Sequence, residues 1–108
     1  MSKDYHIVND CLVLKIPKLY GSLSDTIKDN YINSKAKHLI LDLSSVKNIT
    51  DKHIENFINF GKNIVCDNSF VLISNLFFDE SLPIVPTLQE AFDFIEMEDI
   101  ERLLTNNE

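Results

Sequence analysis

The sequence has only two glycines, Gly21 and Gly61, and they stand far apart. A phosphate-binding loop needs several closely spaced glycines, so neither a P-loop nor a dinucleotide fingerprint is present. Cysteine is equally scarce, because Cys11 and Cys66 stand alone, without a CxxC pair or a histidine at ligand spacing. We therefore expect free, buried thiols in a reducing compartment, with no disulfide, no zinc site and no cofactor.

Long apolar runs are absent as well. No stretch reaches 18 apolar residues, and the first ten residues lack the apolar segment of a signal peptide, so we expect a cytoplasmic protein without membrane insertion. The formal net charge of −7 argues against nucleic-acid binding, which depends on clustered Lys and Arg. Residues 63–108 carry ten acidic residues and one cation, Arg102. That imbalance fits either a solvated acidic helix or electrostatic steering of a partner.

What is present is the composition of an ordinary globular protein. The 108 residues are 44% hydrophobic and 25% charged, which suits one domain with a single core. Internal repeats, low-complexity tracts and linkers are not found. We expect one domain over residues 1–108, with loose termini at 1–4 and 105–108.

Apolar runs of strand length predict the sheet. Two short runs separated by Asn9 and Asp10 read as a β-hairpin, because both residues tolerate the left-handed backbone of a tight turn. The run HLILDL is too short for a helix and has polar flanks, so it is the best candidate for a central strand buried on both faces. The expected strands are 5–8, 11–16, 38–43 and 69–74, with an edge strand at 83–86.

Helical periodicity predicts three helices between and after these strands. Residues 51–65 show the clearest pattern, with Ile54, Phe57, Ile58, Gly61, Ile64 and Val65 on one face. A weaker helix is expected from Ser22, which forms a capping-box-like start with Asp25, to about Ser34. A last helix starts at the capping box of Thr87 and Glu90, and its apolar row continues to Leu104 after a bend. This order predicts an α/β fold with a largely parallel or mixed sheet.

The stretch LILDLSSVKNITDKHIENFINF, from Leu39 to Phe60, resembles the STAS domain of bacterial anti-sigma-factor antagonists. In that family a buried strand leads through a short turn into an amphipathic helix. The run PIVPTLQEAF resembles the family's late strand and capped helix, and the resemblance covers about residues 5–95. It implies a mixed sheet of four to five strands with helices mainly on one face. The matching positions are Asp42, Leu43, Val46, Ile49 and Ile54.

This sequence departs from the family at the turn itself. Thr50 takes the place of the usual Asp, Asp51 that of the phosphorylated serine, Lys52 that of the second hydroxyl residue and His53 that of the glycine. Asp51 cannot be phosphorylated as a serine is, and one carboxylate only partly mimics a phosphate group. Residues 75–82 are also too few for the family's full helix there, so we expect a third helix shortened to one or two turns.

A helix amino terminus presents unpaired N–H groups and the positive end of the helix dipole, which favour an acceptor or an anion. Thr50 or Asp51 could simply cap the helix, worth about 1 kcal/mol. The alternative is a docking site with a fixed charge at Asp51. Lys47, Lys52 and His53 would then form a cationic rim that recognises an acidic partner surface. The predicted partner-binding residues are Lys47, Asn48, Thr50, Asp51, Lys52, His53, Glu55 and Asn56.

The resemblance implies a non-catalytic, bacterial regulatory module that binds an anti-sigma-factor kinase, a scaffold of STAS domains or a transporter ATPase. A divergent antagonist, a transporter-associated subunit and a small-ligand or nucleotide-binding domain stay open as alternatives. His53, Glu55 and Asp42 could serve in acid/base chemistry, but no nucleophile stands with them at recognisable spacing. A homodimer through exposed Phe77 and Phe78 also stays open, as does their packing over the short connection.

Overall fold

The computed structural model of the chain describes residues 5–16, 23–65, 68–77 and 79–106. Five strands, three α-helices and one π-helical segment make up these residues. In chain order they are β1 (Tyr5–Val8), β2 (Cys11–Lys15), α1 (Leu23–Ser34), β3 (His38–Asp42), α2 (Asp51–Asn59), η1 (Phe60–Val65), β4 (Phe70–Ile73), β5 (Ile84–Val85) and α3 (Leu88–Asn106).

The five strands form one sheet in the order β1-β2-β3-β4-β5. The hairpin pair β1 and β2 is antiparallel, and every other neighbouring pair is parallel. Asn9 and Asp10 have φ angles of 51° and 64°, which confirms the predicted tight turn of left-handed residues. The predicted α/β fold with a mixed sheet of four to five strands is therefore confirmed.

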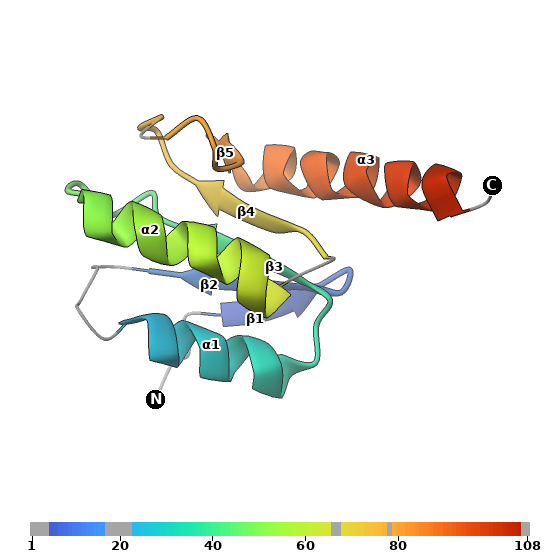
Figure 1. Cartoon of the computed structure of the whole chain (residues 1–108), viewed down its shortest axis with the longest axis horizontal. Coiled ribbons are helices and arrows are strands. Elements are labelled where there is room, and N and C mark those ends of the chain that lie inside the picture. The colour runs from blue at the N-terminus through green and yellow to red at the C-terminus, as the bar shows by residue number, and fades with distance from the viewer. Residues whose placement is uncertain (1–4, 17–22, 66–67, 78, 107–108) are drawn as a thin grey trace.

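Helices cover both faces of the sheet (Figure 1). Leu39 and Leu41 of β3 lie in the core under α1, α2 and η1, whereas Ile40 between them lies in the second core under α3. All three side chains are fully buried, which explains why the predicted central strand reads as a continuous apolar run. Two of the three helices thus share one face, and α3 takes the other.

The helix predicted over residues 51–65 is present, but it changes form after Asn59 and continues as the π-helical η1. Hydrogen bonds from i to i+5 place residues five apart on one face, so Phe60 and Val65 are both buried. Phe60 stacks on Phe70 with ring centroids 6.2 Å apart. A Cβ atom at Gly61 would lie 3.3 Å from the Phe70 ring, so the absence of a side chain there suits this close packing.

Two expectations about the carboxyl-terminal third are corrected. α3 runs from Leu88 to Asn106 as one helix, with no break where the bend is expected. The expected short helix between β4 and β5 is absent from the described residues, which form bends and a turn there. The expected capping box at Ser22 and the side chains of Cys66 and Phe78 lie outside the described residues.

The short β4–β5 connection leaves a cleft beside η1. Parallel neighbouring strands are usually joined by a crossover of a dozen or more residues that contains a helix. Here residues 74–83 make the link, and no helix covers this part of the sheet among the described residues. A cleft of about 510 Å³ lies there instead, and it is lined by Phe57, Ile58, Gly61, Lys62, Asn68, Phe70, Ser81, Leu82, Pro83, Glu98 and Arg102.

Candidate functional site

The predicted docking turn connects the carboxyl end of β3 to the amino end of α2. Leu43 and Val46 are buried and Ile49 packs against the same core, so every third residue anchors the segment to the sheet. The Asp42 carboxylate accepts a hydrogen bond of 3.0 Å from the Ser44 N–H, which closes the first bend. The polar residues between these anchors therefore lie at the surface on a fixed backbone.

Thr50 is the N-cap residue of α2. Its Oγ1 accepts a hydrogen bond of 3.3 Å from the His53 N–H, and its own N–H donates to His53 Nδ1 at 3.1 Å. The two residues form a reciprocal capping box in which His53 takes the part usually played by Glu or Gln. Because Nδ1 accepts the Thr50 N–H, the neutral ring carries its proton on Nε2. The capping role left open between Thr50 and Asp51 thus belongs to Thr50.

Asp51 occupies the first turn of α2 with its side chain exposed. A carboxylate there interacts favourably with the positive end of the helix dipole, by about 0.3–1 kcal/mol. Within the described part of the chain, Lys47 and Lys52 make no ion pair, and both are exposed. The turn therefore presents one carboxylate and two cations that are available to an incoming surface.

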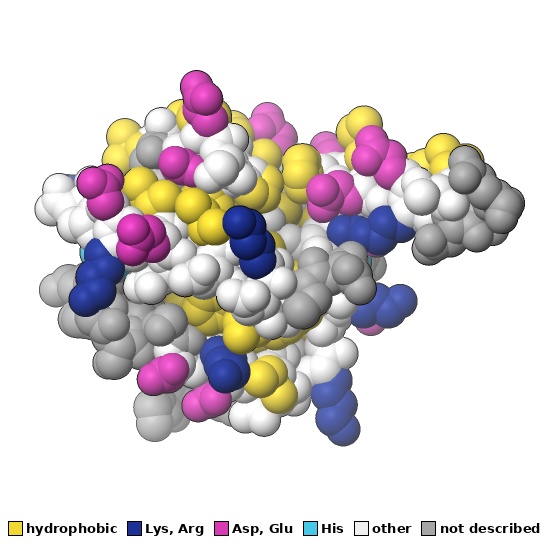
Figure 2. All heavy atoms as spheres, in the orientation of Figure 1, with side chains coloured by type: hydrophobic (Ala, Val, Ile, Leu, Met, Phe, Trp, Pro, Cys, Tyr) yellow, Lys and Arg dark blue, Asp and Glu magenta, His cyan; other side chains and the backbone are white. Residues whose placement is uncertain are grey.

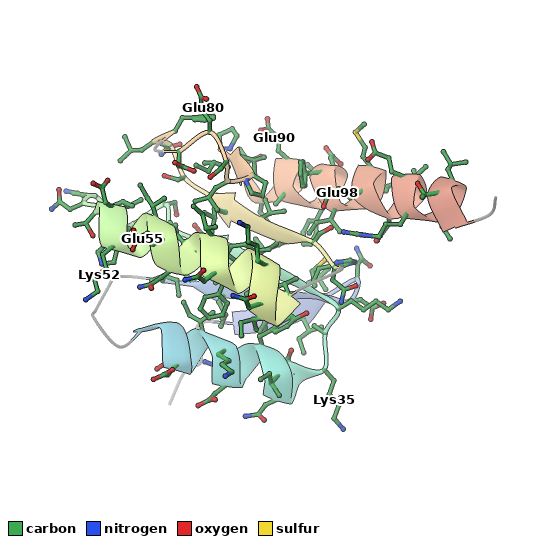
Figure 3. The ribbon with its side chains drawn as sticks, viewed as in Figure 1. Lys35, Lys52, Glu55, Glu80, Glu90 and Glu98 are labelled. Atoms are coloured by element: carbon green, nitrogen blue, oxygen red, sulfur yellow. The ribbon has the colours of Figure 1, made fainter. Side chains whose placement is uncertain are left out.

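The structure gathers most of the predicted site residues at this end of α2. Figure 3 shows Lys52 and Glu55 there, projecting outward from the helix. Asn48 and Thr50 are exposed as well, and His53 is half-buried against its capping partner. Asn56 is set apart, because it lines a shallow depression of about 320 Å³ between α2, η1 and α1. Six exposed residues and His53 thus form one surface, which we call the α2 turn surface: Lys47, Asn48, Thr50, Asp51, Lys52, His53 and Glu55.

A second polar cluster lies at the opposite end of the parallel strands, where β3 and β4 begin. The Ser69 N–H donates to His38 Nδ1 at 3.0 Å, and His38 Nε2 lies 3.2 Å from Asp99 of α3. Arg102 bonds Asp99 at 2.7 Å and the Ser69 hydroxyl at 2.8 Å. The same hydroxyl donates to Glu98 at 2.5 Å. Figure 3 shows Glu98 projecting from α3.

This cluster joins α3 to the sheet. His38 and Ser69 are buried, and the hydrogen bonds of His38 engage both of its ring nitrogens. The Ser69 hydroxyl donates to a carboxylate and not to the imidazole, so the arrangement differs from a serine nucleophile activated by histidine. Sequence reasoning placed His38 and Ser69 on strands but missed their partners. The available signal was a pair of polar residues at the starts of apolar strands, with one Arg in an acidic helix.

Cys11 is a buried thiol beside this cluster, as predicted from its isolation in the sequence. Burial, with smaller contributions from the carboxylates of Asp99 and Asp10, raises the pKa of Cys11 from 9.0 to about 11. A thiol that stays protonated is a poor nucleophile and a poor metal ligand. Across residues 5–16, 23–65, 68–77 and 79–106, no group of three or more His, Cys, Asp and Glu side chains could hold a metal ion.

The raised pKa of Cys11 predicts a loss of stability at alkaline pH. Below about pH 9 the Cys11 thiol is protonated in both the folded and the unfolded chain. Between about pH 9 and 11 it ionises only in the unfolded chain, and this ionisation lowers the free energy of unfolding. Once the pH exceeds about 11, this pKa shift lowers the free energy of unfolding by about 2–3 kcal/mol. Urea denaturation from about pH 8 to 11 should show a steeper decline for the wild type than for Cys11→Ala. Parallel declines would contradict the prediction.

Among the described residues, no helix is long and apolar enough to cross a membrane.

Comparison with known proteins establishes the fold. No protein-family sequence model matches the chain, and no curated protein sequence matches it significantly. A crystal structure from Thermotoga maritima, of a protein assigned as an anti-sigma factor antagonist, matches with a TM-score of 0.67 and 24% identity over 85% of this chain and 92% of that one. An anti-sigma factor antagonist from Mycobacterium paratuberculosis matches with a TM-score of 0.63 and 15% identity over 85% and 91%. The chain therefore has the STAS fold that its sequence resembles.

Proposed function

We propose that this STAS-fold domain is a non-catalytic module of the bacterial cytoplasm that binds a regulatory protein through the α2 turn surface. The observation that carries the proposal is the exposure of Asp51 and Lys52 on a backbone anchored by Leu43, Val46 and Ile49. A rigid, exposed turn that carries charge favours recognition of a partner surface with little loss of conformational entropy. The likeness to anti-sigma factor antagonists supports a protein as the partner.

The charge at Asp51 is fixed, and so the proposed binding is not turned off by phosphorylation at this position. We favour a constitutive docking or scaffold role over that of a conventional antagonist. The partner classes that suit it are an anti-sigma-factor kinase, a scaffold of similar domains and a transporter ATPase. Replacing Asp51 by serine would restore a hydroxyl at that position. Comparing the proteins captured from the native cell by wild type and by Asp51→Ser separates a fixed dock from a divergent antagonist.

Lys52→Glu should slow association with the captured partner by about threefold to tenfold at low salt, because rim charges act mainly on the association rate. The difference should shrink at high salt, where exposed charges are screened. The matched control is Lys35→Glu, an identical charge change at an exposed lysine. Figure 3 shows Lys35 beyond the far end of α1 from Lys52. Stopped-flow or surface-plasmon-resonance kinetics measure both rates.

Equal association rates for wild type and Lys52→Glu at low salt would contradict the proposed site. So would an equal slowing by Lys35→Glu, because that result would indicate a general effect of net charge. The nucleotide-binding alternative makes a different prediction, since a ligand that binds only the folded chain raises its thermal midpoint. A midpoint that rises with ATP or GTP in the wild type, and rises less in Lys52→Glu, would favour that alternative.

A further inference from the structure

The carboxyl-terminal half of α3 carries an apolar row that the rest of the chain does not cover. Figure 1 shows α3 continuing beyond the sheet toward the carboxyl end. Met97, Ile100 and Leu104 are 65%, 50% and 69% exposed. Their i, i+3 and i+7 spacing places them on one face of the helix, and we call these three residues the α3 seam. Leu103 beside them is exposed as well.

The opposite side of this helix half is held in place. Arg102 bonds both Asp99 and the buried Ser69, while Glu98 accepts the Ser69 hydroxyl. Rotation of α3 to bury the seam would break these bonds and withdraw the acceptor from buried His38. The α3 seam is therefore held facing solvent. Exposed apolar side chains that cluster on one face of a protein mark an interaction surface.

The charges beside the seam determine what can cover it. The spacing of Met97, Ile100 and Leu104 is that of successive a, d and a positions in a heptad pattern, which makes Glu96 a g position and Glu101 an e position. Both glutamates are exposed, and they make no ion pair within the part of the chain that the structure describes. Figure 2 shows acidic side chains among the apolar ones on the protruding part of α3.

The same pattern disfavours a second copy as the occupant. In a parallel pair of α3 helices, g and e positions face each other across the interface, which would set Glu96 against Glu101 of the other copy. An antiparallel pair would also bring together two helices that each carry six acidic residues and one cation, Arg102. An anionic membrane surface is disfavoured for the same reason. An amphipathic helix with basic residues beside its own apolar row complements both the α3 seam and the carboxylates that flank it.

We infer that the α3 seam is a second docking surface, which binds an amphipathic helix of a partner protein with Lys or Arg on either side of its apolar row. This surface lies on the opposite face of the sheet from α2, and the inference does not depend on the proposed function of the α2 turn surface. Two helical turns of apolar contact are a small interface, so we expect micromolar affinity. The two surfaces would allow the domain to join two partners.

Fluorescence anisotropy with a labelled Leu/Lys peptide of about 18 residues, whose leucines recur at i, i+3, i+4 and i+7, tests the inference. The wild type should bind this peptide at least about tenfold more tightly than a scrambled Leu/Lys peptide or a Leu/Glu peptide of the same spacing. The Ile100→Ser/Leu104→Ser variant should lose about tenfold in affinity. The matched control is Ile7→Ser/Ile32→Ser, at positions 50% and 56% exposed on other elements, which should bind as the wild type does.

A second pair of variants tests the charges. Glu96→Gln/Glu101→Gln should lower the affinity for the Leu/Lys peptide several-fold and reduce the salt dependence of its binding. Asp29→Asn/Glu80→Gln removes the same charge at exposed positions elsewhere and should leave both the affinity and its salt dependence unchanged. These variants alter exposed side chains, and circular dichroism and thermal midpoints check that each one is folded.

Equal affinity of the wild type and Ile100→Ser/Leu104→Ser for the Leu/Lys peptide would overturn the inference, because the peptide would then be binding elsewhere. Equal binding of the Leu/Glu peptide would overturn it too. Sedimentation velocity tests whether a second copy of the chain occupies the seam instead. If the wild type dimerises and Ile100→Ser/Leu104→Ser is monomeric, the seam pairs with a second copy and the inference is wrong. The α2 turn surface is tested separately by Lys52→Glu, which should not alter peptide binding.

Discussion

Phe57→Ala should lower the free energy of unfolding by about 3–5 kcal/mol. The Phe57 side chain is 3% exposed, and it packs in the core between α2 and the sheet. Its removal loses the transfer free energy of the ring and leaves a cavity beside the existing cleft. A domain of this size has a total stability of roughly 5–15 kcal/mol, so the loss is a large part of it.

Urea denaturation followed by circular dichroism measures this effect, which should shift the midpoint down by about 2 M for a typical urea slope. Asn59→Ala, at an exposed position on the same helix, is the matched control and should change stability by less than about 0.5 kcal/mol. A loss below about 1 kcal/mol for Phe57→Ala would mean that this ring does not attach α2 to the sheet. Because α2 carries the turn surface, Phe57→Ala should also weaken partner binding.

The second large effect is expected from His38→Ala. Its ring accepts the buried Ser69 N–H at Nδ1, so removing the ring leaves a donor without an acceptor, at a cost of roughly 1–3 kcal/mol. The loss of the contact with Asp99 should loosen α3 as well. Hydrogen exchange at the Ser69 amide should accelerate beyond the change in global stability, because the opening is local.

Two variants distinguish the effect of losing this hydrogen bond from the general effect of replacing a histidine. His38→Asn offers an amide oxygen near the place of Nδ1 and should recover part of the loss, whereas His38→Ala should not. His6→Ala makes the identical change at an exposed histidine of β1 and should be nearly neutral. If His38→Ala and His6→Ala have equal stabilities, the polar cluster does not contribute to holding α3.

The candidate site could be predicted in part because its determinants are close together in the sequence. Thr50 and His53 are three residues apart, and the apolar residues before them already mark the segment as anchored. That a histidine completes the capping box could not be foreseen, because Glu and Gln are its usual members. The hydrogen bonds between His38 and Asp99 and between Ser69 and Arg102 span 61 and 33 residues. The polar residues at the starts of the strands are visible in the sequence, but their distant partners are not.

The sequence by itself determined the β1–β2 turn, the start of α2 and the two-sided burial of β3. Left-handed Asn9 and Asp10, the run from His38 to Asp42 and the periodicity after Asp51 each depend on neighbouring residues, so local physical chemistry decides them. The tertiary structure decided the rest. Parallel pairing brought distant strands together and placed α3 alone on one face, where contacts with His38 and Ser69 turn its seam outward. Which side of an amphipathic helix stays exposed depends on what packs against it, and only the assembled sheet determines that.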